Sequence, residues 1–178
     1  MISKSDTMLV LACHGENDNQ DRLTEKGKEQ ARLAGQHIKG FIASNESVEQ
    51  AIKRSPWTSV SYHCSMSPCT GQTLYEIHNI IHGGHREAGR EELLCSERAL
   101  GESLMDVYIR AGLLMERFQW FSRDKLAVVS SHKEFLTMLH QYIVGKPSEG
   151  EWENGEVRIY KVQPWHTGSL VSPTEFDS

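Results

Sequence analysis

The stretch Leu9-Val10-Leu11-Ala12-Cys13-His14-Gly15-Glu16 is the part of the sequence from which the fold can be read. Its apolar run stops abruptly at a histidine and a glycine. This pattern is typical of a buried strand that delivers a reactive side chain to the edge of a sheet. We therefore expect His14 at the carboxyl end of a central strand.

Outward from this stretch, strand-like and helix-like patterns alternate along the chain. Strands are predicted over Thr7–Ala12, Trp57–Ser65, Lys125–Ser131 and Glu156–Val162, the last after an Asn154-Gly155 turn. Helices are predicted after Thr24, over Val48–Ile52, from Pro68 to Gly83, over Leu104–Phe118 and over Phe135–Ile143. Leu93–Ser96 reads as a short strand or an extended segment, and no element is predicted after Pro164. The alternation predicts an α/β fold of three layers, α/β/α, with a mainly parallel central sheet. No linker divides the chain, so we expect one domain over residues 1–178.

The composition excludes several classes of function. A formal net charge of −5 without a basic block argues against nucleic-acid binding. No apolar run is long enough for a membrane span, and the polar N-terminal residues lack the apolar core of a signal peptide, so we expect a cytoplasmic protein. Four cysteines in a chain of 178 residues are expected to be thiols and not a disulfide scaffold. The oligomeric state does not follow from these features.

Polar side chains follow three of the predicted strands. They lie in Cys13-His14-Gly15, in Ser65–Cys69 and in Ser130-Ser131-His132. In an open α/β sheet, ligands bind at the carboxyl ends of the strands. Helices are predicted to begin soon after the second and third segments, and their free backbone N–H groups favour an anion. Two histidines placed in this way are expected to face one another.

These segments resemble the motifs of the histidine phosphatase superfamily, the phosphoglycerate-mutase-like group. Leu9–Gly15 followed by Leu23–Ala31 is similar to the family's Arg-His-Gly strand end and its Leu-Thr-x-x-Gly-x-x-Gln-Ala helix start. Further similarities, in the family's order, are Ser65–Thr73 ending in Gln72-Thr73, Glu97–Gly101, Val129–His132 and Asn154–Val157. Together they span residues 8–162, which is nearly the whole chain.

The resemblance implies a role for three residues. His14 would be the nucleophile that accepts a phosphoryl group, Glu97 the proton donor to the leaving oxygen, and His132 the second histidine at the phosphate. A neutral imidazole is a competent nucleophile when its other nitrogen is held by a hydrogen bond. The resemblance implies no metal and no other cofactor, because cationic side chains stabilise the charge in this family. The implied partner is a phosphorylated small molecule or a phosphopeptide.

Three departures from the family pattern bear on activity. Cys13 and Cys69 stand where the family has arginines that grip the phosphate, and Lys133 stands where glycine is common. Two lost hydrogen bonds to a charged group are worth roughly 3–6 kcal/mol. That loss corresponds to a rate decrease on the order of 10² to 10⁴. We therefore expect weak hydrolysis or none, unless Arg22, Arg98 or Lys133 replaces the missing donors at the substrate.

The cysteines leave other hypotheses open. Cys13 and Cys69 can be small thiols that fill the space of the arginines, a redox pair, or part of a Cys₂His₂ zinc site with His14 and His132. His78 and His82, one helical turn apart, form a weaker candidate for a metal pair. The functional alternatives to a weak phosphatase are thus an inactive binding protein, or pseudophosphatase, and a thiol or metal site.

Overall fold

One six-stranded sheet forms the centre of the protein. The computed structural model describes residues 7–54, 59–83, 90–91, 93–121, 126–162 and 169–172. The strands are β1 (Thr7–Cys13), β2 (Val60–Cys64), β3 (Arg90–Glu91), β4 (Leu126–Ser131), β5 (Val157–Val162) and β6 (Ser169–Ser172). Their order across the sheet is β3-β2-β4-β1-β5-β6. The first four strands of this order run parallel to one another, and β5 and β6 are antiparallel additions at one side.

The register of the sheet brings the candidate segments together. Cys13 of β1 lies opposite Ser131 of β4, and Cys64 of β2 lies opposite Ser130. The carboxyl ends of β1, β2 and β4 therefore share one edge of the sheet. The segments that follow these three strands are the ones for which the sequence predicts a site.

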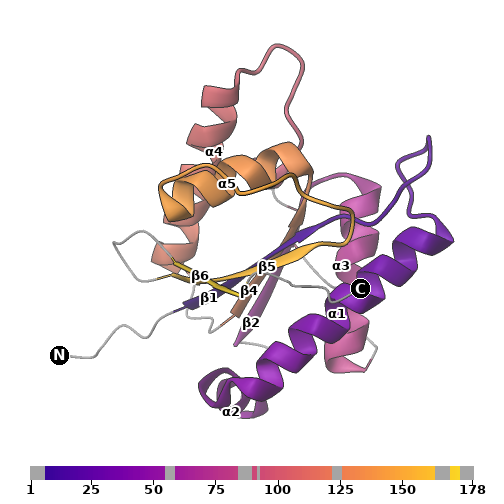
Figure 1. Cartoon of the computed structure of the whole chain (residues 1–178), viewed down its shortest axis with the longest axis vertical. Coiled ribbons are helices and arrows are strands. Elements are labelled where there is room, and N and C mark those ends of the chain that lie inside the picture. The colour runs from indigo at the N-terminus through magenta and orange to yellow at the C-terminus, as the bar shows by residue number, and fades with distance from the viewer. Residues whose placement is uncertain are drawn as a thin grey trace.

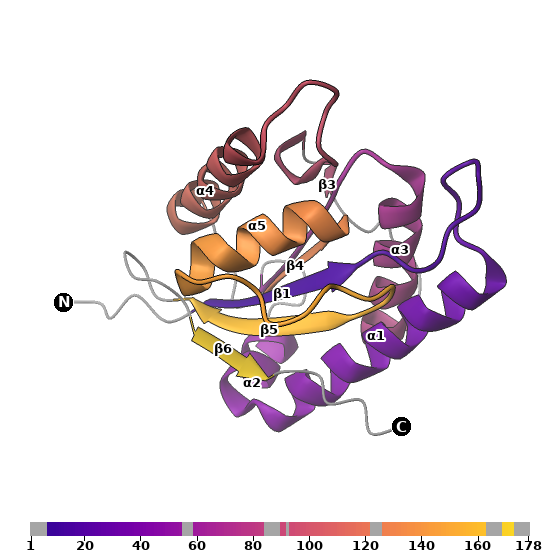
Figure 2. The same cartoon turned by 45° about the horizontal axis from the view of Figure 1, so that its top comes forward.

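Helices cover both faces of the sheet. The helices are α1 (Glu25–Ser44), α2 (Glu46–Arg54), α3 (Pro68–His82), the 3₁₀ helix η1 (Leu93–Cys95), α4 (Leu104–Phe121) and α5 (Lys133–Val144). Figure 1 shows α4 and α5 on one face and α1, α2 and α3 on the other. Figure 2, turned by 45°, shows the same separation. The three-layer α/β/α class is thus confirmed.

The side-chain alternation along β1 divides the core into two halves. Leu9, Leu11 and Cys13 pack into the cluster made with α4 and α5. Met8, Val10 and Ala12 pack into the cluster made with α1, α2 and α3. Because both faces of a central strand are buried, the strand reads in sequence as one continuous apolar run. The burial of both faces of β1 thus explains the apolar run over residues 9–12.

The helix boundaries follow from local chemistry. The Thr24 hydroxyl accepts a hydrogen bond from the Gly27 N–H and so caps α1, as the sequence predicts. Pro68 occupies the first turn of α3. Gly83 and Gly145 end α3 and α5 in the left-handed conformation, where a side chain would be strained.

Two sequence predictions are wrong in detail. Leu93–Cys95 forms a 3₁₀ helix instead of a strand, and the short strand lies just before it at Arg90–Glu91. Ser169–Ser172 forms the edge strand β6, where no element was expected. Only four residues long, β6 is defined by its pairing with β5, which local sequence does not record. Residues 57 and 58, which begin the second predicted strand, and residue 125, which begins the third, lie outside the described residues. Within the described chain, every helix is too short or too polar to span a membrane.

Candidate active site

His14 lies directly after β1 and is held by backbone contacts on both sides. Its N–H donates to the Ser131 carbonyl (3.2 Å), and its own carbonyl accepts from the Gly155 N–H (3.1 Å). The ring Nδ1 lies 2.8 Å from the Gly15 carbonyl oxygen, so Nδ1 carries the proton. The lone pair is therefore on Nε2, which is the state that a nucleophilic imidazole requires.

Two glycines bring the His14 segment against the start of α1. A Cβ atom added at Gly15 would strike the Gly27 backbone, and one added at Gly27 would strike the Glu16 carbonyl. Neighbouring side chains complete this contact. The Thr73 hydroxyl accepts from the Gly15 N–H (3.1 Å), and the Gln72 amide oxygen accepts from the Leu23 N–H (2.7 Å). These sequence motifs thus fit together because they form one contact between β1, α1 and α3.

His132 lies opposite His14. It follows β4 as the N-cap residue of α5, and its ring centroid is 5.0 Å from that of His14. Its Nε2 is 3.0 Å from the Ser65 hydroxyl oxygen. Burial, together with the neighbouring His14, lowers the pKa of His132, so the ring is neutral near pH 7.

The hydrogen bonds around Ser65 hold the His132 ring in place. Thr70 Oγ1 donates to the Ser67 carbonyl (2.8 Å), which can only accept. The Ser65 hydroxyl oxygen accepts from the Ser67 N–H (3.2 Å) and lies 2.8 Å from Thr70 Oγ1. When His132 Nε2 carries the ring proton, it donates to Ser65 and leaves the lone pair on Nδ1. Sequence reasoning missed Ser65 and Thr70 as positioning residues, although both lie in a segment that was singled out.

The two cysteines at the family's arginine positions lie in different surroundings. Cys13 is fully buried with Leu9 and Leu11 on the α4/α5 side of the sheet. Burial raises the pKa of Cys13 to about 12. Cys69 is buried in a small cluster with Leu23 and Ala31, near the start of α3. Burial, with the adjacent Asp21 carboxylate, raises the pKa of the Cys69 thiol.

Three donor atoms converge at the strand ends. A ring nitrogen of His14, a ring nitrogen of His132 and the Cys69 sulfur all lie within 4.8 Å of one another. Among the described residues Cys13 is not part of this group, so the hypothesis of a Cys₂His₂ set is wrong in this one ligand. All four cysteines are free thiols. We call His14, Ser65, Cys69, Thr70 and His132 the histidine site.

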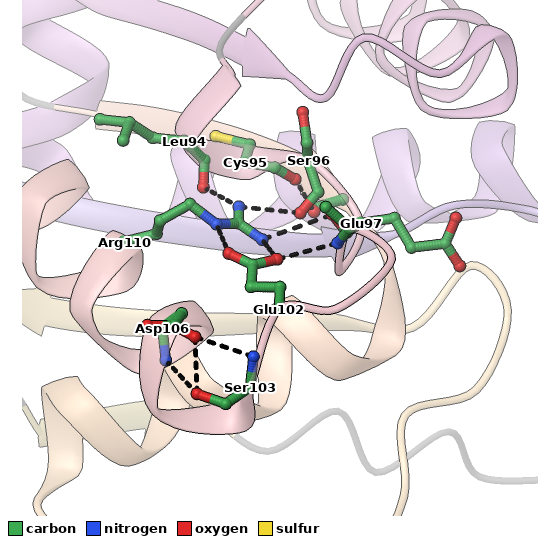
Figure 3. A network of polar contacts seen from close by, with 10 residues as sticks. Leu94, Cys95, Ser96, Glu97, Glu102, Ser103, Asp106 and Arg110 are labelled. Carbon is green, nitrogen blue, oxygen red and sulfur yellow. Dashed lines mark hydrogen bonds and ion pairs between the residues drawn. The ribbon is translucent and has the colours of Figure 1, made fainter.

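A second structure borders the histidine site. Residues 94–102, which we call the Arg110 loop, are held by one guanidinium group from α4 (Figure 3). Arg110 donates to the Leu94 and Ser96 carbonyls (2.9 and 3.0 Å) and pairs with both carboxylate oxygens of Glu102 (2.6 and 2.9 Å). The Ser131 hydroxyl also donates to the Cys95 carbonyl, which attaches the loop to β4. Arg110 was not predicted, since it stands inside a helical pattern without a motif.

The remaining predicted residues lie around these two structures. Glu97 is exposed on the Arg110 loop, and its charge acts on His132. Arg98 pairs with Glu134 of α5 at 3.1 Å. Lys133 is exposed at the start of α5, where its charge acts on Cys13. Arg22 is exposed in the turn before α1. For the other metal candidate, His82 Nε2 contacts the Tyr62 hydroxyl at 2.8 Å.

Solved structures resemble this protein over nearly its whole length. Mycobacterial hydrolase 1 has a TM-score of 0.70 at 16% sequence identity, covering 94% of this chain and 98% of its own. Mycobacterial glucosyl-3-phosphoglycerate phosphatase in complex with inorganic phosphate has a TM-score of 0.63 at 18% identity, covering 93% and 96%. YhfR of Bacillus stearothermophilus has a TM-score of 0.64 at 18% identity, covering 93% and 95%. No protein-family model matches the sequence, and no curated protein aligns with it.

The chain has the same fold as these solved structures. The fold that the motif resemblance implies is thus confirmed. The strand ends that carry His14 and His132 form the edge of the sheet at which ligands of open α/β sheets bind.

Proposed function

We propose that the protein binds a phosphorylated small molecule or a phosphopeptide at the histidine site and hydrolyses it slowly through a phosphohistidine at His14. The observation that supports this proposal is the arrangement of the two imidazole rings, which face each other at the ends of β1 and β4. His14 Nδ1 is hydrogen-bonded to the Gly15 carbonyl, so the Nε2 lone pair is available, and the His132 ring lies 5.0 Å away.

The reaction is a double displacement. His14 Nε2 attacks phosphorus and the ester P–O bond breaks, while Glu97 gives a proton to the departing oxygen. Water then attacks the phosphohistidine, its proton passes to Glu97, and the P–N bond breaks to release inorganic phosphate. Glu97 is thus deprotonated after the first step, and the second step returns both Glu97 and His14 to their starting protonation states.

The slow rate follows from the donors near the phosphate. Cys13 and Cys69 are both fully buried and offer only weak S–H donors in place of charged ones. Arg98 is engaged with Glu134 across the Arg110 loop and α5. Lys133, next to His132 and exposed, is the best placed cation to replace a lost arginine.

Trapping of the intermediate tests this proposal. A phosphate monoester carrying labelled phosphorus should transfer acid-labile label to the wild-type chain. His14→Gln should lose at least 90% of this label, because the acceptor nitrogen is gone. His37→Gln, a matched change on α1, should keep it.

The outcome also distinguishes the alternatives. Equal labelling of His14→Gln and the wild type would overturn the nucleophile assignment. Absence of labelling and of hydrolysis, with retained binding of inorganic phosphate, would instead make the protein a pseudophosphatase.

A further inference from the structure

The histidine site offers two imidazole nitrogens and one thiol sulfur, which are ligand atoms for a transition-metal ion. We propose that His14, Cys69 and His132 bind a divalent transition-metal ion of the zinc type, with two imidazole nitrogens and one thiolate as ligands. The three side chains come from the end of β1, the first turn of α3 and the end of β4. Their donor atoms lie within 4.8 Å of one another.

Each imidazole already has the hydrogen bond that a metal ligand needs on its other nitrogen. The His14 Nδ1–H donates to the Gly15 carbonyl, and His132 Nε2 lies 3.0 Å from the Ser65 hydroxyl, an oxygen that can accept its N–H. Metal-bound histidines characteristically donate their second N–H in this way, which fixes the tautomer and the ring orientation. Both rings thus keep one lone-pair nitrogen for a metal ion.

The charges around the site favour a cation. The carboxylate of Asp21 acts on both Cys69 and His132, and that of Glu97 acts on His132. Of the nearby cations, Arg98 is paired with Glu134, and the charge of Lys133 acts on the Cys13 thiol. Negative charges that act on the ligand side chains favour the binding of a divalent cation.

The three ligand side chains must move slightly closer together to bind one zinc ion. Zinc bonds of about 2.0–2.3 Å place tetrahedral ligand atoms roughly 3.3–3.6 Å apart, so the side chains must approach by at most about 1.5 Å. On binding, the Cys69 thiol releases its proton to solvent, and the fourth position remains for water. Three protein ligands and one open position are the arrangement of reactive zinc sites.

This inference does not rest on the proposed phosphatase activity. A metal ion would occupy the same His14 lone pair that attacks phosphorus, so the metal-bound chain cannot form the phosphohistidine. The two proposals therefore describe two exclusive states of one site, and each has its own measurement.

Cobalt titration of the whole chain, purified without chelators or a histidine tag, tests the metal site. We expect one Co²⁺ per chain with a thiolate-to-cobalt charge-transfer band, and displacement of this band by one equivalent of Zn²⁺. Mg²⁺ should not displace it, since this ion prefers oxygen ligands. Binding weaker than millimolar, or binding without the charge-transfer band, would overturn the proposal.

Matched variants locate the ligands. Cys69→Ser should abolish the band and weaken binding by more than the 10- to 100-fold typical for the loss of an outer-shell partner. Cys13→Ser, the same change at the other buried cysteine, should leave both unchanged. His14→Gln supplies a second ligand deletion at a partly exposed position, should Cys69→Ser fail to fold. Retention of tight binding by His14→Gln, or its loss in a folded Cys13→Ser, would contradict the assignment.

Discussion

The histidine site and the Arg110 loop adjoin one another but are built in different ways. The histidine site stands on strand ends, and its residues are fixed by sheet register and backbone hydrogen bonds such as His14 N–H to Ser131. The Arg110 loop has no strand or α-helix between Cys95 and Leu104, and one guanidinium group gathers its carbonyls (Figure 3). The first is therefore part of the core, whereas the second is held by side-chain contacts, and Arg110 makes most of them.

This difference separates the two halves of the proposed chemistry. The proposed nucleophile His14 and its partner His132 directly follow central strands and are held by the backbone of the sheet. Glu97, the proposed proton donor, is only as well placed as the loop that carries it. Disruptive changes within the core should lower the stability of the whole fold, and changes at the loop should alter the position of Glu97 while the fold survives.

The largest expected effect comes from an arginine placed in the core at position 13. Cys13→Arg should lower the free energy of unfolding by about 3–5 kcal/mol, the cost of an uncompensated buried charge. The nearby Glu156 already pairs with Arg158, and Lys133 repels the new charge.

Cys69→Arg is the matched comparison, because Asp21 can pair with the new guanidinium. It should cost less stability than Cys13→Arg and should speed phosphate-ester hydrolysis roughly 10- to 100-fold through one charged hydrogen bond. Urea denaturation and initial rates measure the two effects. Equal destabilisation by both arginines would show that the two cysteines do not differ in the way described.

An intermediate effect is expected from removing the support of the loop. Arg110→Met keeps the aliphatic stem but removes the cation beside Glu102 and the donor to three carbonyls of the loop, so stability should fall by about 1.5–3 kcal/mol. Proteolytic cleavage within residues 94–102 should rise before global unfolding. Arg117→Met, on the exposed side of the same helix, serves as the control. Unchanged cleavage in Arg110→Met would mean that other contacts hold the loop.

The smallest effect is a difference in acid sensitivity between core and loop. Burial lowers the pKa of His140 on α5. Its Nδ1 lies 2.8 Å from the hydroxyl oxygen of Tyr160 on β5. As the pH falls, the unfolded chain therefore binds a proton at His140 before the folded chain does. The contribution of neutral His140 to stability is fully present above pH 6.5, the ordinary histidine pKa, and is lost as the pH falls below it. The decline is at most about 1.4 kcal/mol per pH unit for one histidine.

In the loop, the hydrogen bond from Arg110 lowers the pKa of Glu102 below its ordinary 4.5. The contribution of this pair is therefore present above pH 4.5 and is lost only at lower pH. Amide hydrogen exchange across a pH series, compared with His140→Gln, should show the core weakening first and the loop later. Simultaneous loss of protection in both regions would contradict this order.

The sequence by itself determined the layered fold and the two histidines. A strand buried on both faces must read as an apolar run, and Gly15 and Gly27 stand where two backbones touch. These constraints act on each residue locally, so they leave a local trace. The capping of α1 by Thr24 is of the same kind.

Only the tertiary structure decided the surroundings of Cys13 and Cys69, the contacts of the Arg110 loop and the pairing of β6. In sequence, Cys13 and Cys69 are the same residue type at two family arginine positions. In the fold, one packs against α4 and α5, and the other lies beside both histidines. Such contacts join residues that are far apart in the chain, and no local pattern encodes which distant groups will surround a side chain. The physical character of the site therefore depended on packing, while its location depended on the strand that ends at His14.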